Sequence, residues 1–138
     1  MHKVHNFGRH STGLELPDIV HLKLVGEVEL LECRQIHQTH IEFAQDLEHM
    51  FYMIDLSELD NIPAAVRREA SETVKNLPLR GTVIYQTPLR ARVLAKLLLT
   101  AVNLFKGGAG QNPVEFVDTV EEARLWVDRR RHQIAHAA

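Results

Sequence analysis

The sequence predicts a single α/β domain with a mostly parallel central sheet of about five strands, covered by about four helices. Short runs of β-branched or apolar residues alternate along the chain with longer segments of helical periodicity. Turn-forming residues separate the two kinds of segment. The 138 residues suit one domain, and 45% hydrophobic with 25% charged residues is an ordinary globular composition.

The N-terminal half predicts two strands, a long helix, a buried strand and a second helix. We expect residues 1–11 to form a flexible segment, because they are polar and show no apolar pattern. The predicted elements are then an edge strand over 13–16, a strand over 18–25 ended by Gly26, a helix over 27–47, a strand over 50–56 buried on both faces, a loop over 57–62 and a helix from Pro63 to about Asn76.

The C-terminal half continues the alternation. It predicts a strand over 80–86, a helix capped by Thr87 that runs to Lys106, a short strand over 114–117 and a helix that begins at a capping box and ends near Arg131. The box is formed by Thr119 and Glu122. We therefore place the domain over residues 12–132, with a flexible tail over 133–138. The leading strand is expected to run antiparallel at one edge of the sheet.

Composition narrows the function classes. The chain has 16 basic and 18 acidic side chains and a net charge of −2, which argues against nucleic-acid binding. Its one cysteine, Cys33, allows no internal disulfide and fits a reducing compartment. We find no apolar run of the roughly 20 residues that a transmembrane helix needs and no signal-peptide pattern. A cytoplasmic protein without a cofactor is the expectation.

Three segments together resemble a known group of small domains. They are HLKLVG at residues 21–26, which opens a long helix, IDLSELDNI at 54–62, which leads from a buried strand to a helix, and the segment from Phe116 to Trp126 in the last strand and helix. This combination resembles the SpoIIAA-like and STAS domains, including their branch related to CRAL-TRIO lipid-carrier folds. The resemblance covers residues 12–131 and implies a SpoIIAA/STAS-like fold and a non-enzymatic regulatory domain.

The resemblance also raises the question of a phosphorylation switch. In anti-sigma factor antagonists of this group, a partner kinase phosphorylates a serine at the start of the helix after the Asp-Leu-Ser strand. The matching positions here are about Pro63, Ala64 and Ala65, which carry no hydroxyl. The resemblance thus implies that the switch is missing at its usual place. Ser57 lies nearby at the strand end, where a local turn bond is favoured over modification.

A few polar residues could serve a ligand. Asp55 ends a buried strand, and Gln86 and Thr87 end another, which is where open α/β sheets bind ligands. The alternative is that Asp55 and Thr87 only satisfy backbone N–H groups of the loops. His37 and His40 have a spacing that can share a metal. His40, however, falls near the centre of the apolar stripe of its helix, where a core histidine hydrogen-bonded to the backbone is the commoner outcome.

The helix after Pro88 carries the strongest functional hint. Residues 89–105 read LRARVLAKLLLTAVNLF, so the apolar arc is wider than a helix lying on a sheet requires. Excess apolar surface usually marks a contact. Three alternatives remain for what contacts this apolar surface: the domain's own helices, a second subunit, or a lipophilic ligand or membrane surface. The candidate surface residues are Leu94, Leu98, Val102 and Phe105.

We therefore expect a non-catalytic regulatory or scaffold domain that acts through protein contacts, as a homodimer or with another protein partner. The alternative is a carrier or sensor of a small lipophilic ligand. An enzyme that uses Asp55 is the weakest hypothesis, because no paired acid or base is visible in the sequence.

Overall fold

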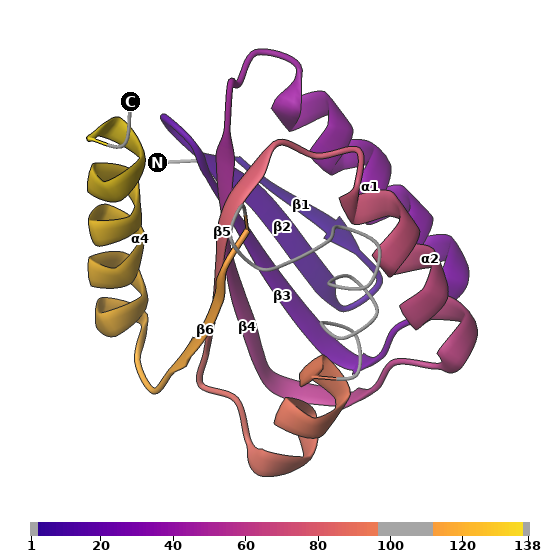
Figure 1. The fold of residues 1–138 in the computed structure, drawn as a ribbon. Coiled ribbons are helices and arrows are strands. Elements are labelled where there is room, and N and C mark those ends of the chain that lie inside the picture. Colours follow the sequence, from indigo (N-terminus) through magenta and orange to yellow (C-terminus); the bar gives the residue numbers. More distant parts are fainter. Residues whose placement is uncertain (1–2, 97–111, 137–138) are drawn as a thin grey trace.

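The computed structural model describes residues 3–96 and 112–136 and contains one six-stranded sheet with the order β1-β2-β3-β4-β5-β6 (Figure 1). The strands β1 to β3 pair antiparallel, and β3 to β6 pair parallel. The strands are β1 (Val4–Phe7), β2 (His10–Glu15), β3 (Ile19–Glu27), β4 (Met50–Asn61), β5 (Leu79–Tyr85) and β6 (Val114–Val117). The predicted α/β class, with helices between parallel strands and an antiparallel leading strand, is confirmed.

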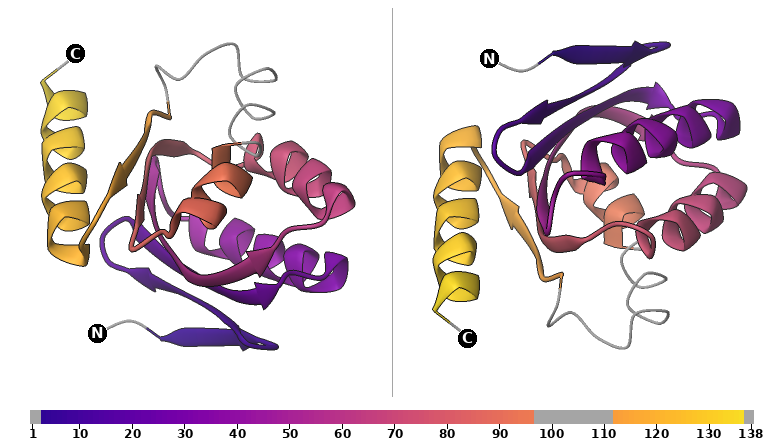
Figure 2. Two further views of the ribbon diagram at one scale, coloured as in Figure 1. Left: turned by 90° about the horizontal axis from the view of Figure 1, so that it is seen from below. Right: turned by 90° about the horizontal axis from the view of Figure 1, so that it is seen from above.

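Helices cover both faces of this sheet. The labelled helices are α1 (Leu30–Ala44), α2 (Ala64–Val74) and α4 (Val120–Ala135), and residues 89–96 are also helical. Helices α1 and α2 lie side by side on one face, and α4 lies on the opposite face beside β5 and β6 (Figures 1 and 2). We call the first face the α1/α2 face and the second the α4 face.

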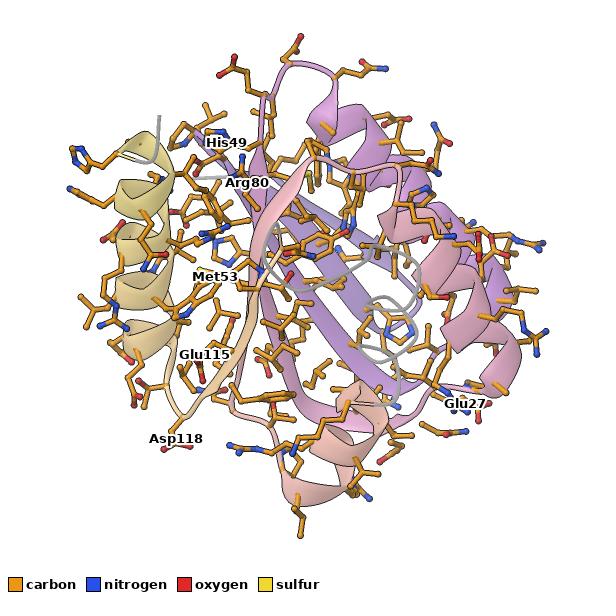
Figure 3. The ribbon with its side chains drawn as sticks, in the orientation of Figure 1. Glu27, His49, Met53, Arg80, Glu115 and Asp118 are labelled. Atoms are coloured by element: carbon orange, nitrogen blue, oxygen red, sulfur yellow. The ribbon has the colours of Figure 1, made fainter. Side chains whose placement is uncertain are left out.

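Strand alternation divides the core between these faces. On β4, the buried side chains of Phe51 and Met53 pack with Ala123 and Val127 of α4. Figure 3 shows Met53 between the sheet and α4. The intervening side chains, such as Leu56, pack on the α1/α2 face with Val66 of α2 and with the 89–96 helix. The prediction that this strand is buried on both faces is confirmed.

The N-terminus differs from the sequence prediction. Residues 4–7, expected to be flexible, form β1, which pairs with residues 10–13 of β2 through a turn at Gly8 with φ +62°. The hairpin was missed because β1 alternates only between exposed and half-buried positions, so its apolar pattern is weak. The hairpin also extends the edge strand predicted over 13–16 back to His10.

Strand β4 is longer than predicted. Residues 57–61, expected in a loop, continue the strand, because β3 extends through Gly26 to Glu27 and supplies pairing partners as far as Asn61. The register of this pairing shifts between Lys23 and Val25 and again between Gly26 and Glu27. Gly26 adopts φ +72°, a conformation that glycine takes readily. The polar sequence of this segment therefore marks an irregular strand rather than a loop.

Helix boundaries also shift. Thr87 does not cap the following helix with its hydroxyl, which instead donates to the backbone oxygen of Tyr85 at 3.2 Å. Pro88 supplies the first helical acceptor, since the Arg92 N–H donates to its carbonyl oxygen. Thr119 caps α4 as predicted by accepting from the Glu122 N–H at 3.1 Å. Helix α1 is shorter than predicted at both ends, and α4 continues past Arg131 to Ala135.

Candidate functional site

An apolar cavity of about 150 Å³ lies on the α1/α2 face, between the sheet and the helices α1, α2 and 89–96. The sheet contributes side chains of β3, β4 and β5, among them Leu22, Ile54 and Ile84. The helices contribute mainly small or apolar side chains, among them Ile36, Val66 and Ala70. The wall also includes Ala95 and Asn112, which lie on the two sides of residues 97–111, outside the described part.

The described wall of this cavity carries no Asp, Glu, Lys or Arg side chain. Its titratable groups are Cys33, His37, His40 and Tyr52. Burial raises the pKa of Cys33 to about 11 and lowers the pKa of His40 to about 3. Burial also lowers the pKa of His37 and raises that of Tyr52. All four groups are therefore uncharged near neutral pH.

A buried hydrogen-bond chain backs one side of the cavity. The Nε2 atom of His40 lies 2.8 Å from the hydroxyl of Thr12, and its Nδ1 atom lies 2.7 Å from the hydroxyl of Tyr52. The Thr12 hydroxyl also lies 2.8 Å from the carbonyl oxygen of His21. The chain links β2, α1 and β4, so it fixes the orientations of the His40 and Tyr52 rings in the wall.

Thr82 and Asn112 form a second polar pair in the wall. The Thr82 hydroxyl donates to Oδ1 of Asn112 at 3.0 Å, and both residues are buried. Thr73 of α2 uses its hydroxyl in the same manner, since it donates to the backbone oxygen of Ala70 at 3.0 Å. The cavity thus combines an apolar surface with a few polar groups in fixed positions, which is the usual composition of a small-molecule site.

A smaller hollow of about 100 Å³ lies on the α4 face and is lined by Lys23, Asp55 and Tyr85, among others. Its charged groups are engaged within the protein. Lys23 pairs with Glu58 at 2.7 Å, and Oδ1 of Asp55 accepts the Ser57 N–H at 2.9 Å. These partners leave the hollow a poorer ligand site than the apolar cavity.

The apolar cavity is not lined by the polar candidates Asp55, Ser57, Gln86 and Thr87. Asp55 and Ser57 lie in the middle of β4, and Asp55 pairs in register with Tyr85, directly before Gln86. Gln86 is exposed and adopts φ 55°, and Thr87 is buried. Neither Gln86 nor Thr87 lines the apolar cavity or the smaller hollow.

The candidate surface on the third predicted helix is only partly within the described residues. Leu94 is half-buried and packs against the core of the α1/α2 face. Leu98, Val102 and Phe105 lie outside the described residues. In the described part of this helix, the exposed apolar residues are Leu89 and Val93, which are 79% and 55% exposed.

His37 and His40 do not belong to a metal site within residues 3–96 and 112–136, where no group of three His, Cys, Asp or Glu side chains could hold an ion. His40 is instead a hydrogen-bonded core histidine, whose partners are side chains. Within the same residues, no helix combines the length and the apolar character needed to cross a membrane.

Tyr52 and Thr82 line the cavity but are not among the residues that the sequence singled out. Tyr52 interrupts the apolar run MFYMIDL, and Thr82 lies in a β-branched strand, so both read as ordinary strand residues. A buried tyrosine usually finds a hydrogen-bond partner, which is the one signal that the sequence offered. The partner, His40, is 12 residues away on α1 and could not be paired with Tyr52 without the fold.

No protein-family model and no curated protein matches the sequence. The chain is similar to the solved structure of the anti-sigma factor antagonist SpoIIAA in its unphosphorylated form, with 14% sequence identity and a TM-score of 0.47. The similarity covers 96% of this chain and 97% of the SpoIIAA chain. SpoIIAA is a member of the group of domains that three segments of the sequence resemble.

Proposed function

We propose that this domain binds a small, uncharged lipophilic molecule in the apolar cavity of the α1/α2 face, without catalysing a reaction. The observation that carries the proposal is a cavity of about 150 Å³ whose described wall has no charged side chain. A dry apolar cavity of roughly 150 Å³ is large enough to take up a benzene-sized molecule. A ligand of one ring, or the end of a longer lipophilic molecule, fits this space.

The chemistry of the wall supports binding rather than catalysis. A general acid or base needs a pKa near the working pH, yet the pKa of His40 is lowered to about 3 and that of Cys33 raised to about 11. His40 also has hydrogen-bond partners at both ring nitrogens. These groups therefore orient and complement a ligand more readily than they transfer protons.

The test is direct binding with a cavity-blocking variant. Toluene is titrated while the midpoint of thermal unfolding is followed, and native mass spectrometry detects any molecule that co-purifies with the protein. The variant Ala70→Leu places a larger side chain in the cavity wall, and Ala65→Leu makes the same change at an exposed position of α2. Toluene is expected to raise the midpoint for the original chain and for Ala65→Leu, and much less for Ala70→Leu.

Two results would reject the proposal. One is the absence of any shift with toluene together with a mass free of bound molecules. The other is an equal shift in the Ala70→Leu and Ala65→Leu variants, because binding would then occur elsewhere.

A second candidate function is a regulatory or scaffold role through protein contacts, with a second copy of this chain as the partner. The exposure of Leu89 and Val93 favours it, since these residues are one helical turn apart on the same side of the helix. Neighbouring exposed apolar side chains on one side of a helix can form part of a larger contact surface.

Sedimentation analysis over a range of concentrations tests this candidate. The original chain is expected to dimerise, and Val93→Glu is expected to shift it toward the monomer. Leu16→Glu is the control, because Leu16 is also an exposed leucine, at 78%, but lies after β2 away from this helix. A chain that is monomeric at every concentration would rule out the dimer.

A further inference from the structure

The direction of each hydrogen bond around His40 follows from the chemistry of the partners. The carbonyl oxygen of His21 can only accept, so the Thr12 hydroxyl at 2.8 Å donates to it. The oxygen of Thr12 must then accept from Nε2–H of His40. A neutral imidazole has one N–H, which leaves Nδ1 of His40 as the acceptor for the Tyr52 hydroxyl at 2.7 Å.

The proton of Tyr52 is therefore committed to His40. If the hydroxyl rotated toward a ligand, Nδ1 of His40 would remain buried without a donor, which is the more costly arrangement. The oxygen of Tyr52 keeps a lone pair, and Tyr52 is part of the cavity wall. At this position the wall offers a hydrogen-bond acceptor and no donor.

The other hydroxyls of the described wall behave alike. Thr73 donates to the Ala70 carbonyl oxygen and Thr82 donates to Asn112 Oδ1, so each presents only acceptor lone pairs to further partners. The remaining polar groups of the wall are the weak donor Cys33, the ring of His37 and the amide nitrogen of Asn112. The three hydroxyl groups of the described wall are thus acceptors at fixed positions.

The same wall excludes an ionised group. Within the described residues it has no Lys or Arg side chain to pair with a carboxylate or phosphate, and no Asp or Glu side chain to pair with an ammonium group. Burial lowers the pKa of its two histidines, His37 and His40, so both are uncharged near neutral pH. An ion buried there would lose its hydration without gaining a counter-charge. The charged end of a fatty acid or an amine therefore finds no partner in this part of the cavity.

We infer that the ligand is an uncharged, mainly apolar molecule with an O–H or N–H group that donates to the hydroxyl oxygen of Tyr52, as a phenol or an indole does. This inference rests on the proposed function and names the chemical class of its ligand. Tyr52 acts here as a binding residue, and His40 and Thr12 act as positioning residues behind it.

The experiment compares phenol with toluene, which has nearly the same size but no donor. Their affinities are measured by calorimetry for the original chain and for Tyr52→Phe. Loss of one neutral hydrogen bond is expected to weaken phenol binding by about tenfold and to leave toluene binding within about twofold, the level expected for a change that preserves the apolar contacts. Tyr85→Phe is the matched control, because it makes the same change at a tyrosine that packs on the α4 face and does not line the apolar cavity.

A second measurement needs no variant and covers the case in which Tyr52→Phe fails to fold. On the original chain, 3-fluorophenol is a stronger donor than phenol at almost the same size, so it is expected to bind more tightly. If Tyr52 donated to the ligand instead, 3-fluorophenol would bind more weakly.

The outcomes separate this inference from the proposed function. If toluene binds but Tyr52→Phe leaves the ratio of phenol to toluene affinity unchanged, the inference is wrong and the proposed function stands. If benzoate competes with toluene at concentrations as low as phenol requires, the claim of an uncharged ligand is wrong. If neither toluene nor phenol binds to the original chain, the proposed function fails and this inference fails with it.

Discussion

At the scale of single residues, His40 shows how burial fixes a protonation state. The ring is 2% exposed and both of its nitrogens have neutral partners, Thr12 and Tyr52. Burial, with a smaller effect of His37, lowers the pKa of His40 from 6.5 to about 3. The folded chain therefore keeps this ring uncharged over a pH range in which the unfolded chain protonates it.

This difference predicts a pH-dependent stability. Below pH 6.5 the unfolded chain binds a proton at His40 and the folded chain does not until about pH 3. The free energy of unfolding is thus expected to fall as the pH decreases through this window, with a contribution of at most about 1.4 kcal/mol per pH unit. Above pH 6.5 His40 is uncharged in both the folded and the unfolded chain, so it adds no further pH dependence to the free energy of unfolding.

Urea unfolding between pH 8 and pH 4 measures the slope. The variant His40→Gln is expected to show a shallower decline than the original chain, after each is referred to its own value at pH 8. Equal slopes for the two chains would mean that His40 is charged in the folded state or exposed to water.

The sequence could identify His40 but not its role. Its place in the apolar stripe of the helix predicted burial, which is correct, but the expected backbone partner is wrong. No local pattern named its actual partners, because Thr12 and Tyr52 lie on two other elements, 28 and 12 residues away in the chain. Asp55 shows the converse. Its position in a buried strand was readable from the sequence, but β4 continues beyond it, so Asp55 lies within the sheet instead of at its carboxyl edge.

At the scale of elements, α4 is held to the sheet by arginines that the sequence did not single out. Arg124 donates to both carboxylate oxygens of Glu15 at 2.9 Å, and Arg131 donates to both of Asp18. Arg130 donates to the backbone oxygen of Arg80 at 2.6 Å. Figure 3 shows Arg80 on the side of the sheet that faces α4. These contacts reach from the last helix to β2, β5 and the residue before β3.

Asp18→Asn tests the strongest of these contacts. The Asp18 side chain is only 7% exposed and pairs with Arg131 in a two-point contact, so the change is expected to cost about 2–3 kcal/mol of the free energy of unfolding. Trp126, the one tryptophan of the chain, lies on α4, and its fluorescence reports the undocking of this helix during denaturation.

Asp128→Asn is the control for this measurement. Asp128 pairs with the same arginine, but its side chain is 64% exposed, so the expected loss is below about 0.5 kcal/mol. Similar losses for the two variants would show that the contact of Asp18 with Arg131 does not hold the helix.

Gly81 sets how closely α4 approaches β5. A Cβ atom at this position would lie 2.9 Å from Trp126 and 3.1 Å from Phe51, both closer than ordinary contact. Gly81→Ala is therefore expected to destabilise the fold by about 1–3 kcal/mol, as overpacking does. In a Trp126→Leu background the same change is expected to cost less, and thermal unfolding of the four chains measures the difference. An equal cost in both backgrounds would contradict a clash with Trp126.

At the scale of the whole molecule, the α/β class and the mostly parallel sheet with an antiparallel leading strand followed from the alternation of patterns, whereas the cavity did not. The sequence showed that the helix after Pro88 has more apolar surface than one sheet face requires, and it left open what covers that surface. In the described part, Ala91 and Ala95 are buried in the core, while Ala95 also lines the cavity. Internal space depends on how α1, α2 and this helix are spaced, and no local pattern encodes that spacing.

An unfilled cavity also has a cost in stability that a substitution can recover. Ala70→Leu puts three more carbons into this space and is expected to raise the free energy of unfolding by about 1 kcal/mol in the absence of ligand.

Ala70→Leu is then also expected to reduce the stabilisation that toluene gives, because the added side chain and toluene occupy the same space. At a toluene concentration about 100 times the dissociation constant, binding is expected to stabilise the original chain by about 2.7 kcal/mol. Urea unfolding of the original chain, Ala70→Leu and Ala65→Leu, each with and without toluene, measures both effects. A loss of stability in Ala70→Leu without ligand would show that the wall is already closely packed at this position, and the cavity would then be too small for the proposed ligand.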